Sequence, residues 1–367
     1  MFRTGFWRHF DFWLLGAVML TMVFGVTMIR SAIGCNQSLA GLVTRQIIYA
    51  GLGMPVLILV GVIDYRFWGG VVKWMYAVII VFLVVLYLTA GQRFGAARWI
   101  ETGLVSIQPT ELAKIVVIIS LAYYFARNMD QSHKWSWLIK SLLIALGVAV
   151  FIFIQPNLSN VIVILVIWLS MAWVSGLELR KLGIMALTTI ALVVIIFPFL
   201  QPYQIDRVKT FISPDSSSRS GATYNVLQAL IALGSGGLAG KGYGHGTQTQ
   251  LCFMKVRHTD FIFSVVGEEF GYIGSLVVLM LLGFIIYRIL RTARLSADRF
   301  GSLLAYGVAI LIFFQGAVNI AVNLNIIPVT GLPLPFISYG GSGLLSLLLG
   351  IGLVESVILR HKPLDFL

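Results

Sequence analysis

Long apolar runs are the feature that most constrains the fold of this 367-residue chain. A run of about 20 apolar residues is long enough for a helix to cross the hydrocarbon core of a bilayer. The chain has ten such runs, near 12–31, 46–63, 70–89, 109–126, 137–154, 160–175, 182–200, 261–287, 302–325 and 342–359. They predict an all-α polytopic membrane protein with ten transmembrane helices, forming one domain over residues 1–367.

Composition supports this class and argues against a soluble one. Hydrophobic residues make up 59% of the chain and charged residues 11%, more apolar surface than a soluble fold can bury. The net charge of +12 raises nucleic-acid binding as a possibility. However, the Lys and Arg residues are scattered singly through the loops and form no basic stripe, so we expect no nucleic-acid partner.

The distribution of Lys and Arg predicts the orientation of the helices. Ten spans place both termini on one side of the membrane, and the loops and tails of that side hold fifteen Lys and Arg residues. The short loops opposite hold four: Arg30, Arg45, Arg93 and Arg98. Because cytoplasmic loops carry the excess of positive charge, we expect both termini in the cytoplasm.

Two segments interrupt the pattern of helices and short loops. Residues 201–260 form a connection between the seventh and eighth spans, on the outer face, that is far longer than helix connections usually are. Residues 326–343, "IIPVTGLPLPFISYGGSG", are rich in proline and glycine. Irregular backbone at membrane depth is tolerated only where it is buried in protein or lines a cavity. Function therefore belongs near these two segments.

The two cysteines, Cys35 and Cys252, show no zinc-type spacing, so a structural metal is not expected. They can form a disulfide only if the loops that carry them meet. The sequence leaves that pairing open.

The stretch "MKVRHTDFIF" at 254–263 places Asp260 directly before the eighth apolar run. A partly desolvated carboxylate at the interface has the properties of a general base, although nearby cations oppose a raised pKa. The alternative is a structural salt bridge between Asp260 and Arg257. His258 lies between the two.

A second charged pair lies in "QPTELAK" at 108–114. Glu111 and Lys114 stand three residues apart, on one face of the fourth span. Two interpretations stay open. The pair is a structural ion pair, or Lys114 holds an anionic ligand that Glu111 helps to orient.

A third group joins the outer loop to the eighth span. Glu268 and Glu269 lie in "GEEFG" and cannot both face one site. Seven glycines and Lys241 lie between 234 and 246. This loop either approaches a diphosphate or sugar closely or is simply flexible. It does not match a Walker motif, so no nucleotide is expected.

Together these landmarks resemble the SEDS family, the RodA, FtsW and SpoVE proteins of bacterial peptidoglycan synthesis. The resemblance rests on "GAARWIETGLVSIQPTELAK" at 95–114, "RHTDFIFSVVGEEFGYIG" at 257–274 and "PVTGLPLPFISYGGSG" at 328–343, and it extends over essentially the whole chain. The wording "HGTQTQL" at 245–251 is closer to the RodA-like elongation branch.

The resemblance implies a glycosyltransferase that polymerises lipid II at the outer face, for cell elongation and shape. It implies Asp260 as the general base of an inverting transfer. Lys114, Arg98 and Arg257 would balance the charge of the leaving group, with Glu111, His258, Lys241 and Glu268 also in the substrate site. A divalent cation (Mg²⁺ or Mn²⁺) would take part, with Asp260 a possible ligand. The implied partners are undecaprenyl-diphosphate-linked glycan, a class B penicillin-binding protein that acts as transpeptidase, and other elongasome membrane proteins.

Two departures from the family pattern bear on chemistry. The family's acidic residue before "RHTDF" is here Val256, with Lys255 added, so metal binding through that acid is not expected. Asn157 stands where the family has a carboxylate and cannot serve as a base.

Two other functions fit the same composition: a flippase for lipid-linked precursors, and a non-catalytic scaffold for a transpeptidase. A flippase requires charges along a path through both leaflets. We expect apolar inner halves in these spans, with the charges confined to the outer half, which favours the enzyme.

Overall fold

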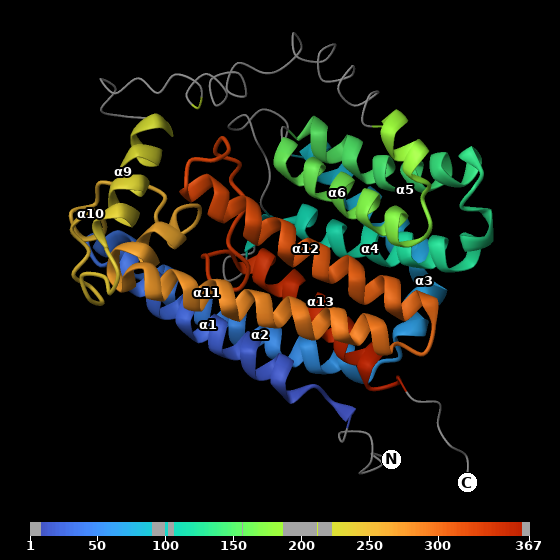
Figure 1. The fold of residues 1–367 in the computed structure, drawn as a ribbon, viewed down its shortest axis with the longest axis horizontal. Helices are drawn as coiled ribbons and strands as arrows, with labels where there is room; N and C mark the ends of the chain where they lie inside the picture. The colour runs from blue at the N-terminus through green and yellow to red at the C-terminus, as the bar shows by residue number, and fades with distance from the viewer. Residues whose placement is uncertain are drawn as a thin grey trace.

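A computed structural model describes residues 9–89, 100–101, 106–155, 157–185, 211 and 222–361 of the chain. Within these ranges the fold is a helical bundle (Figure 1). Its one sheet is a short antiparallel pair, β1 (Ile100–Glu101) and β2 (Ser106–Ile107), with Ile100 opposite Ile107. The pair lies directly before the fourth long helix.

Nine apolar helices coincide with nine of the ten predicted spans. Eight are long and apolar enough to cross a membrane, and the ninth, α6, is shorter. They are α1 (Phe12–Ile33), α2 (Gly41–Val62), α3 (Tyr65–Thr89), α4 (Pro109–Asn128), α5 (Trp135–Ile154), α6 (Leu158–Val174), α11 (Ile262–Leu295), α12 (Arg299–Asn323) and α13 (Gly341–Ile358). The predicted span 182–200 is helical over its first residues, to 185, and the rest lies outside the described ranges.

Helix α4 forms the centre of the bundle. It contacts α3, α5, α6, α12 and α13, while α2 packs along α13 and α1 along α11. Small residues make the α2–α13 contact close, as is common between membrane helices. A Cβ atom on Gly53 would lie 2.3 Å from Leu348 Cδ1, and one on Gly352 would lie 2.6 Å from the carbonyl oxygen of Leu57.

The bundle has two distinct ends. The rings of His9 and His361 lie 5.0 Å apart, so α1 begins and α13 ends at the same end. The outer loop, with α9 (Ala222–Ser235) and α10 (Thr247–Gln250), covers the opposite end (Figure 1). There the hydroxyl of Tyr243 donates to the carbonyl of Thr27 near the end of α1, 3.0 Å away.

Helix α11 is broken near its outer end, and the outer loop repairs the break. Gly271 has φ 65° and ψ −158° inside the helix, a conformation that glycine adopts without strain. The amides of Tyr272 and Ile273 donate instead to the carbonyls of Gly237 and Leu238. Beyond the break, residues 272–295 of α11 span roughly 36 Å, so this part alone is longer than the ~30 Å hydrocarbon core of a bilayer.

The expectation that the inner halves of the spans are apolar is wrong in one place. Glu355 of α13 is fully buried, and its Oε2 accepts from the backbone amide of Asp11 at 3.0 Å. Arg288 of α11 in turn pairs with the Asp11 carboxylate at 2.5 Å. These groups tie α1, α11 and α13 together at the end opposite the outer loop. Their role there is to hold the helices together.

Candidate functional site

Asp260 lies at the end of the bundle opposite the two termini, two residues before α11 begins. Its side chain is half-buried, and its backbone amide donates to the carbonyl of Val256 in a tight turn. A Cβ atom on Gly331 would lie 4.0 Å from Asp260 Oδ2. The carboxylate therefore faces the Pro- and Gly-rich segment. The two irregular segments, 201–260 and 326–343, meet at this point.

The middle of that segment is buried, as the sequence predicted for irregular backbone at this depth, whereas Ile326 and Gly331 are exposed. Leu332, Leu334, Phe336 and Ile337 are each at most 4% exposed. The segment is wedged against α1, because a Cβ atom on Gly25 would lie 2.7 Å from the Cα of Ile337. Its position between α12 and α13 gives the site a rigid wall.

The same segment holds the backbone around Asp260. The amide of Tyr339 donates to the carbonyl of His258 at 2.9 Å, and the hydroxyl of Ser338 donates to the carbonyl of Thr259 at 2.7 Å. Two successive carbonyls before the candidate base are thus fixed by two successive residues of the segment.

Arg257 is directed away from the segment and toward the end of α1. It is 3% exposed, and its guanidinium donates to the carbonyls of Ala32 and Met254. The terminal nitrogen lies against the sulfur atoms of Cys35 and Cys252. Burial lowers the pKa of Arg257. These contacts tie the turn before Asp260 to α1, whereas a contact of Arg257 with a ligand stays a prediction.

The two cysteines form a disulfide with a Cα–Cα distance of 6.0 Å. The loops that carry them do meet, which the sequence had left open. The bond joins the end of α1 to the outer loop, eight residues before Asp260.

His258 stacks obliquely beside Tyr339, with ring centroids 5.9 Å apart. Its Nδ1 is buried and has no hydrogen-bond partner among the described residues. Burial, together with the neighbouring Arg257 charge, lowers the pKa of the imidazole. The ring is therefore neutral at neutral pH, so it offers a ligand a hydrogen bond rather than a positive charge.

Glu111 and Lys114 form the predicted ion pair, with 2.8 Å between Oε1 and Nζ. Pro109 begins α4 at its first position, where its missing N–H costs nothing, and this sets the pair in the first turn and a half. Lys114 is fully buried and also donates to Asn160 Oδ1 of α6 at 3.3 Å.

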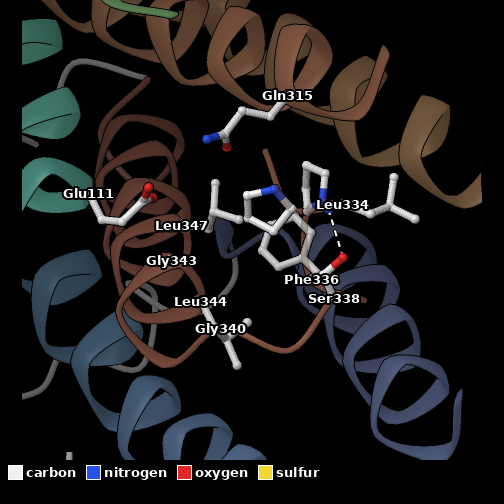
Figure 2. A pocket seen from close by; sticks show the side chains of 11 residues that line it. Glu111, Gln315, Leu334, Phe336, Ser338, Gly340, Gly343, Leu344 and Leu347 are labelled. Atoms are coloured by element: carbon white, nitrogen blue, oxygen red, sulfur yellow. Dashed lines mark hydrogen bonds between the residues drawn. The ribbon is translucent and has the colours of Figure 1, made fainter. Parts of the chain in front are cut away.

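Glu111 borders a narrow cavity between α4, α12, α13 and the Pro- and Gly-rich segment, with about 10 Å³ of space for the centre of a water molecule, roughly enough for one water. Figure 2 shows Glu111 on one side and Gln315 of α12 on the other, with the Leu334–Ser338 hydrogen bond on the wall. Gln315 is 1% exposed, and its Nε2 has no partner among the described residues. A polar group of a ligand or a water would satisfy it.

Lys241 and Glu268 form a separate centre. Glu268 is fully buried and accepts from Lys241 Nζ at 3.0 Å, from the amides of Gln248 and Thr249 and from the hydroxyls of Thr247 and Thr249. Thr247, Gln248 and Thr249 therefore anchor α10 to α11. A substrate role for Lys241 or Glu268 stays a prediction.

Glu269 points toward α1 and away from Lys241. Adjacent residues of a helix are about 100° apart, so the two glutamates were expected to face different neighbours. Glu269 Oε1 accepts from the hydroxyl of Ser31 on α1. The glycines of the loop allow close packing on α11: a Cβ atom on Gly236 would lie 1.9 Å from the carbonyl oxygen of Gly267. Gly236 therefore serves close packing, and an approach of this loop to a diphosphate or sugar stays a prediction.

Arg98 lies outside the described residues. Sequence reasoning also missed five buried polar side chains at the site: Asn160, Gln315, Asn319, Asn323 and Ser338. A signal for three of them was present, because Gln315, Asn319 and Asn323 recur every four residues within one apolar helix and so share a face.

A metal site made by the protein alone needs several donor side chains close together. No group of three or more His, Cys, Asp or Glu side chains in the described part of the chain could hold a metal ion. Val256, where the family has an acid, contributes no ligand. An all-protein site for Mg²⁺ or Mn²⁺, which prefer oxygen ligands, does not fit these residues.

Comparison with known proteins identifies the family. The model of the FtsW, RodA and SpoVE family, described as "Cell cycle protein", matches residues 7–362. The chain belongs to this family. It is 35% identical to peptidoglycan glycosyltransferase MrdB of Escherichia coli K12, over 98% of this chain and 97% of MrdB. It is 34% identical to the probable peptidoglycan glycosyltransferase FtsW of Hydrogenovibrio crunogenus, over 96% and 92% of the two chains.

Two solved structures have the same fold as this chain. A chain from a study of polymerization and crosslinking by a peptidoglycan synthase complex matches with a TM-score of 0.79 at 28% identity, covering 96% of this chain and 97% of that one. The rod shape determining protein RodA of Thermus thermophilus matches with a TM-score of 0.72 at 28% identity, covering 96% and 98%.

Proposed function

We propose that this chain is a peptidoglycan glycosyltransferase that polymerises lipid II for cell elongation, with Asp260 as its general base. One observation carries the proposal: the candidate base faces the Pro- and Gly-rich segment, whose buried middle lines a cavity bordered by Glu111, in a chain whose full-length relatives are named glycosyltransferases. A general base must be reached by the substrate hydroxyl, and Asp260 is half-buried at one end of the bundle.

The reaction joins the 4-hydroxyl of an acceptor sugar to the anomeric carbon of a donor. The new C–O bond forms as the bond from that carbon to the diphosphate breaks, and the hydroxyl proton passes to Asp260. A single displacement inverts the α-linked diphosphate to a β-linkage. One base is enough for this, unlike glycoside hydrolysis, which uses a pair of carboxylates.

The leaving diphosphate needs positive charge or hydrogen-bond donors. We assign Lys114, Arg98 and the neutral His258 to this task, with Glu111 holding Lys114 in place. Arg257, Lys241 and Glu268 stay in the wider substrate site as proposals. The contacts of these three support a mainly structural role.

The participation of a divalent cation stays a proposal, with Asp260 as the one protein ligand. Because the described residues hold no metal cluster, a cation would arrive with the diphosphate, and Asp260 would be a single protein ligand among phosphate oxygens and water. No step of the transfer above depends on it.

We place both termini in the cytoplasm and the site at the outer face of the inner membrane. The excess of Lys and Arg on the terminal side supports this. The Cys35–Cys252 disulfide supports it independently, because disulfides persist in oxidising compartments and are rare in the cytosol. The tenth span, within 182–200, belongs to the same proposal.

The product of polymerisation must be crosslinked, and we propose a class B penicillin-binding protein as the partner, together with other elongasome membrane proteins. Support comes from the structural relative described as part of a complex that coordinates polymerization and crosslinking.

Purified protein in vesicles tests the function. Fluorescent lipid II is supplied on the side of the outer loop, with and without a class B penicillin-binding protein. Formation of long glycan strands supports the proposal. Transfer of lipid II between leaflets without polymer would identify a flippase, and neither activity in the complex would indicate a scaffold.

A further inference from the structure

A polar stripe runs along one face of α12 through an apolar bundle. It consists of Gln315, Asn319 and Asn323, spaced four residues apart, with exposures of 1%, 1% and 0%. Buried amides within a membrane helix are costly unless they are hydrogen-bonded, so they mark a specific use. Gln315 faces the cavity beside Glu111, whereas the two asparagines lie further along, toward Asp260.

Both asparagines donate to the same oxygen. Asn323 Nδ2 lies 2.9 Å from the carbonyl oxygen of Asp260, and Asn319 Nδ2 lies 3.1 Å from it. Asn319 also donates to the carbonyl of Leu332 at 2.8 Å. Asn319 of α12 thus links Asp260 to the Pro- and Gly-rich segment.

Asn323 also holds the first turn of α11, where the Ser264 amide is shared with the carbonyl of Phe261. Its Oδ1 accepts from the amide of Ser264 at 3.0 Å and from the hydroxyl of Ser264 at 2.7 Å. The first turn of a helix leaves N–H groups without partners, and a capping side chain normally comes from the same chain segment. Here a neighbouring helix supplies the cap, and the same amide group holds Asp260.

These bonds complete a row of three fixed carbonyls. Those of His258 and Thr259 accept from Tyr339 and Ser338, and that of Asp260 accepts from both asparagines. Three consecutive peptide groups held from outside leave the Cα of Asp260 little freedom, so the direction of its carboxylate depends on α12.

We propose that Asn319 and Asn323 are positioning residues for Asp260. The inference rests on the proposed role of Asp260 as base. A base must lie within hydrogen-bond reach of the hydroxyl that it deprotonates, and a displacement of about 1 Å can cost about 100-fold in rate. The asparagines touch no reacting atom; they also hold Leu332 and Ser264, and they reach the base through the Asp260 backbone.

Polymerisation kinetics with fluorescent lipid II test the proposal, using Asn319→Ala, Asn323→Ala and the double variant in purified complex. We expect kcat to fall about 10-fold for each single variant and about 100-fold for the double, with KM changed less than about threefold. Gln155→Ala is the matched control, because Gln155 is also a buried amide, 5% exposed, that donates to a backbone carbonyl, that of Leu83, at 3.2 Å. It should lower thermal stability by a similar amount and leave kcat unchanged.

A double-mutant cycle with Asp260→Asn separates positioning from general packing. If the asparagines act through the base, Asn319→Ala reduces the residual rate of the Asp260→Asn enzyme less than twofold. A further 10-fold loss in that background would overturn the proposal, as would a normal kcat for the double alanine variant. Asn319→Ala serves if Asn323→Ala does not fold, because it leaves the bonds between Asn323 and Ser264 at the start of α11 intact.

The two proposals fail separately. A normal rate for Asp260→Asn rejects the general base. A slow Asp260→Asn enzyme combined with normal asparagine variants rejects only the positioning role.

Discussion

The buried pair of Glu111 and Lys114 offers a test in which stability and activity separate. Lys114→Met removes the ammonium and leaves the Glu111 carboxylate without its partner at 2.8 Å. At that distance the attraction is about 6 kcal/mol at an effective dielectric constant of about 20, and desolvation offsets part of it. Removing one member of a buried pair typically costs about 3–5 kcal/mol, because the other charge stays buried. We expect a loss of unfolding free energy in that range.

The double variant Lys114→Met/Glu111→Gln removes both charges. Replacing a whole buried pair by neutral groups of similar volume is close to neutral for stability, so most of the lost stability should return. Activity should not return, because the proposed site needs the Lys114 charge for the diphosphate. Lys140→Met, at an exposed position of α5, is the control and should change stability by less than about 0.5 kcal/mol.

Thermal and denaturant unfolding in detergent measures the first effect, and polymerisation of lipid II measures the second. A Lys114→Met protein as stable as wild type would refute the argument from burial. A double variant that polymerises at the normal rate would show that the pair is structural only, which is the alternative left open by the sequence.

Three further predictions concern the outer end. Cys35→Ser/Cys252→Ser, or reduction of the wild type, should lower stability by about 2–4 kcal/mol; an unchanged unfolding curve would contradict this. The pKa of His258 is lowered in the folded state, so the unfolded chain binds that proton more readily. Stability should therefore fall as pH drops below about 6.5, the unfolded value, and unfolding curves of His258→Gln should lack that part of the slope. Gly240→Ala places a Cβ 2.2 Å from an α11 carbonyl at φ +79° and should destabilise by more than about 2 kcal/mol, whereas Gly16→Ala, with open space around it, should not.

The spans were predictable because each apolar run is close to the length of about 20 residues that crosses a bilayer. Each run also ends in polar or irregular sequence. The runs at 12–31 and 109–126 begin within a residue of α1 and α4. The extension of α11 to Leu295 was not predictable from apolar length, because its last residues, including Arg288 and Arg294, are basic and lie at the helix end.

The site was predictable only in part. Asp260 and the Glu111–Lys114 pair followed from charges in apolar surroundings, which local sequence shows. The direction of Arg257 did not follow, because it depends on α1 and on a disulfide that links residues 217 positions apart. Asn319 and Asn323 are neutral and carry no charge signal, although their four-residue spacing indicates a shared face.

The rate of the Asp260→Asn enzyme, with lipid II binding measured alongside, tests the central claim most directly. Asparagine keeps the size of the side chain but cannot accept the proton. We predict polymerisation at least about 100-fold slower than wild type, with binding unchanged and partial recovery in Asp260→Glu. A rate equal to wild type for Asp260→Asn would contradict the assignment of Asp260 as the general base.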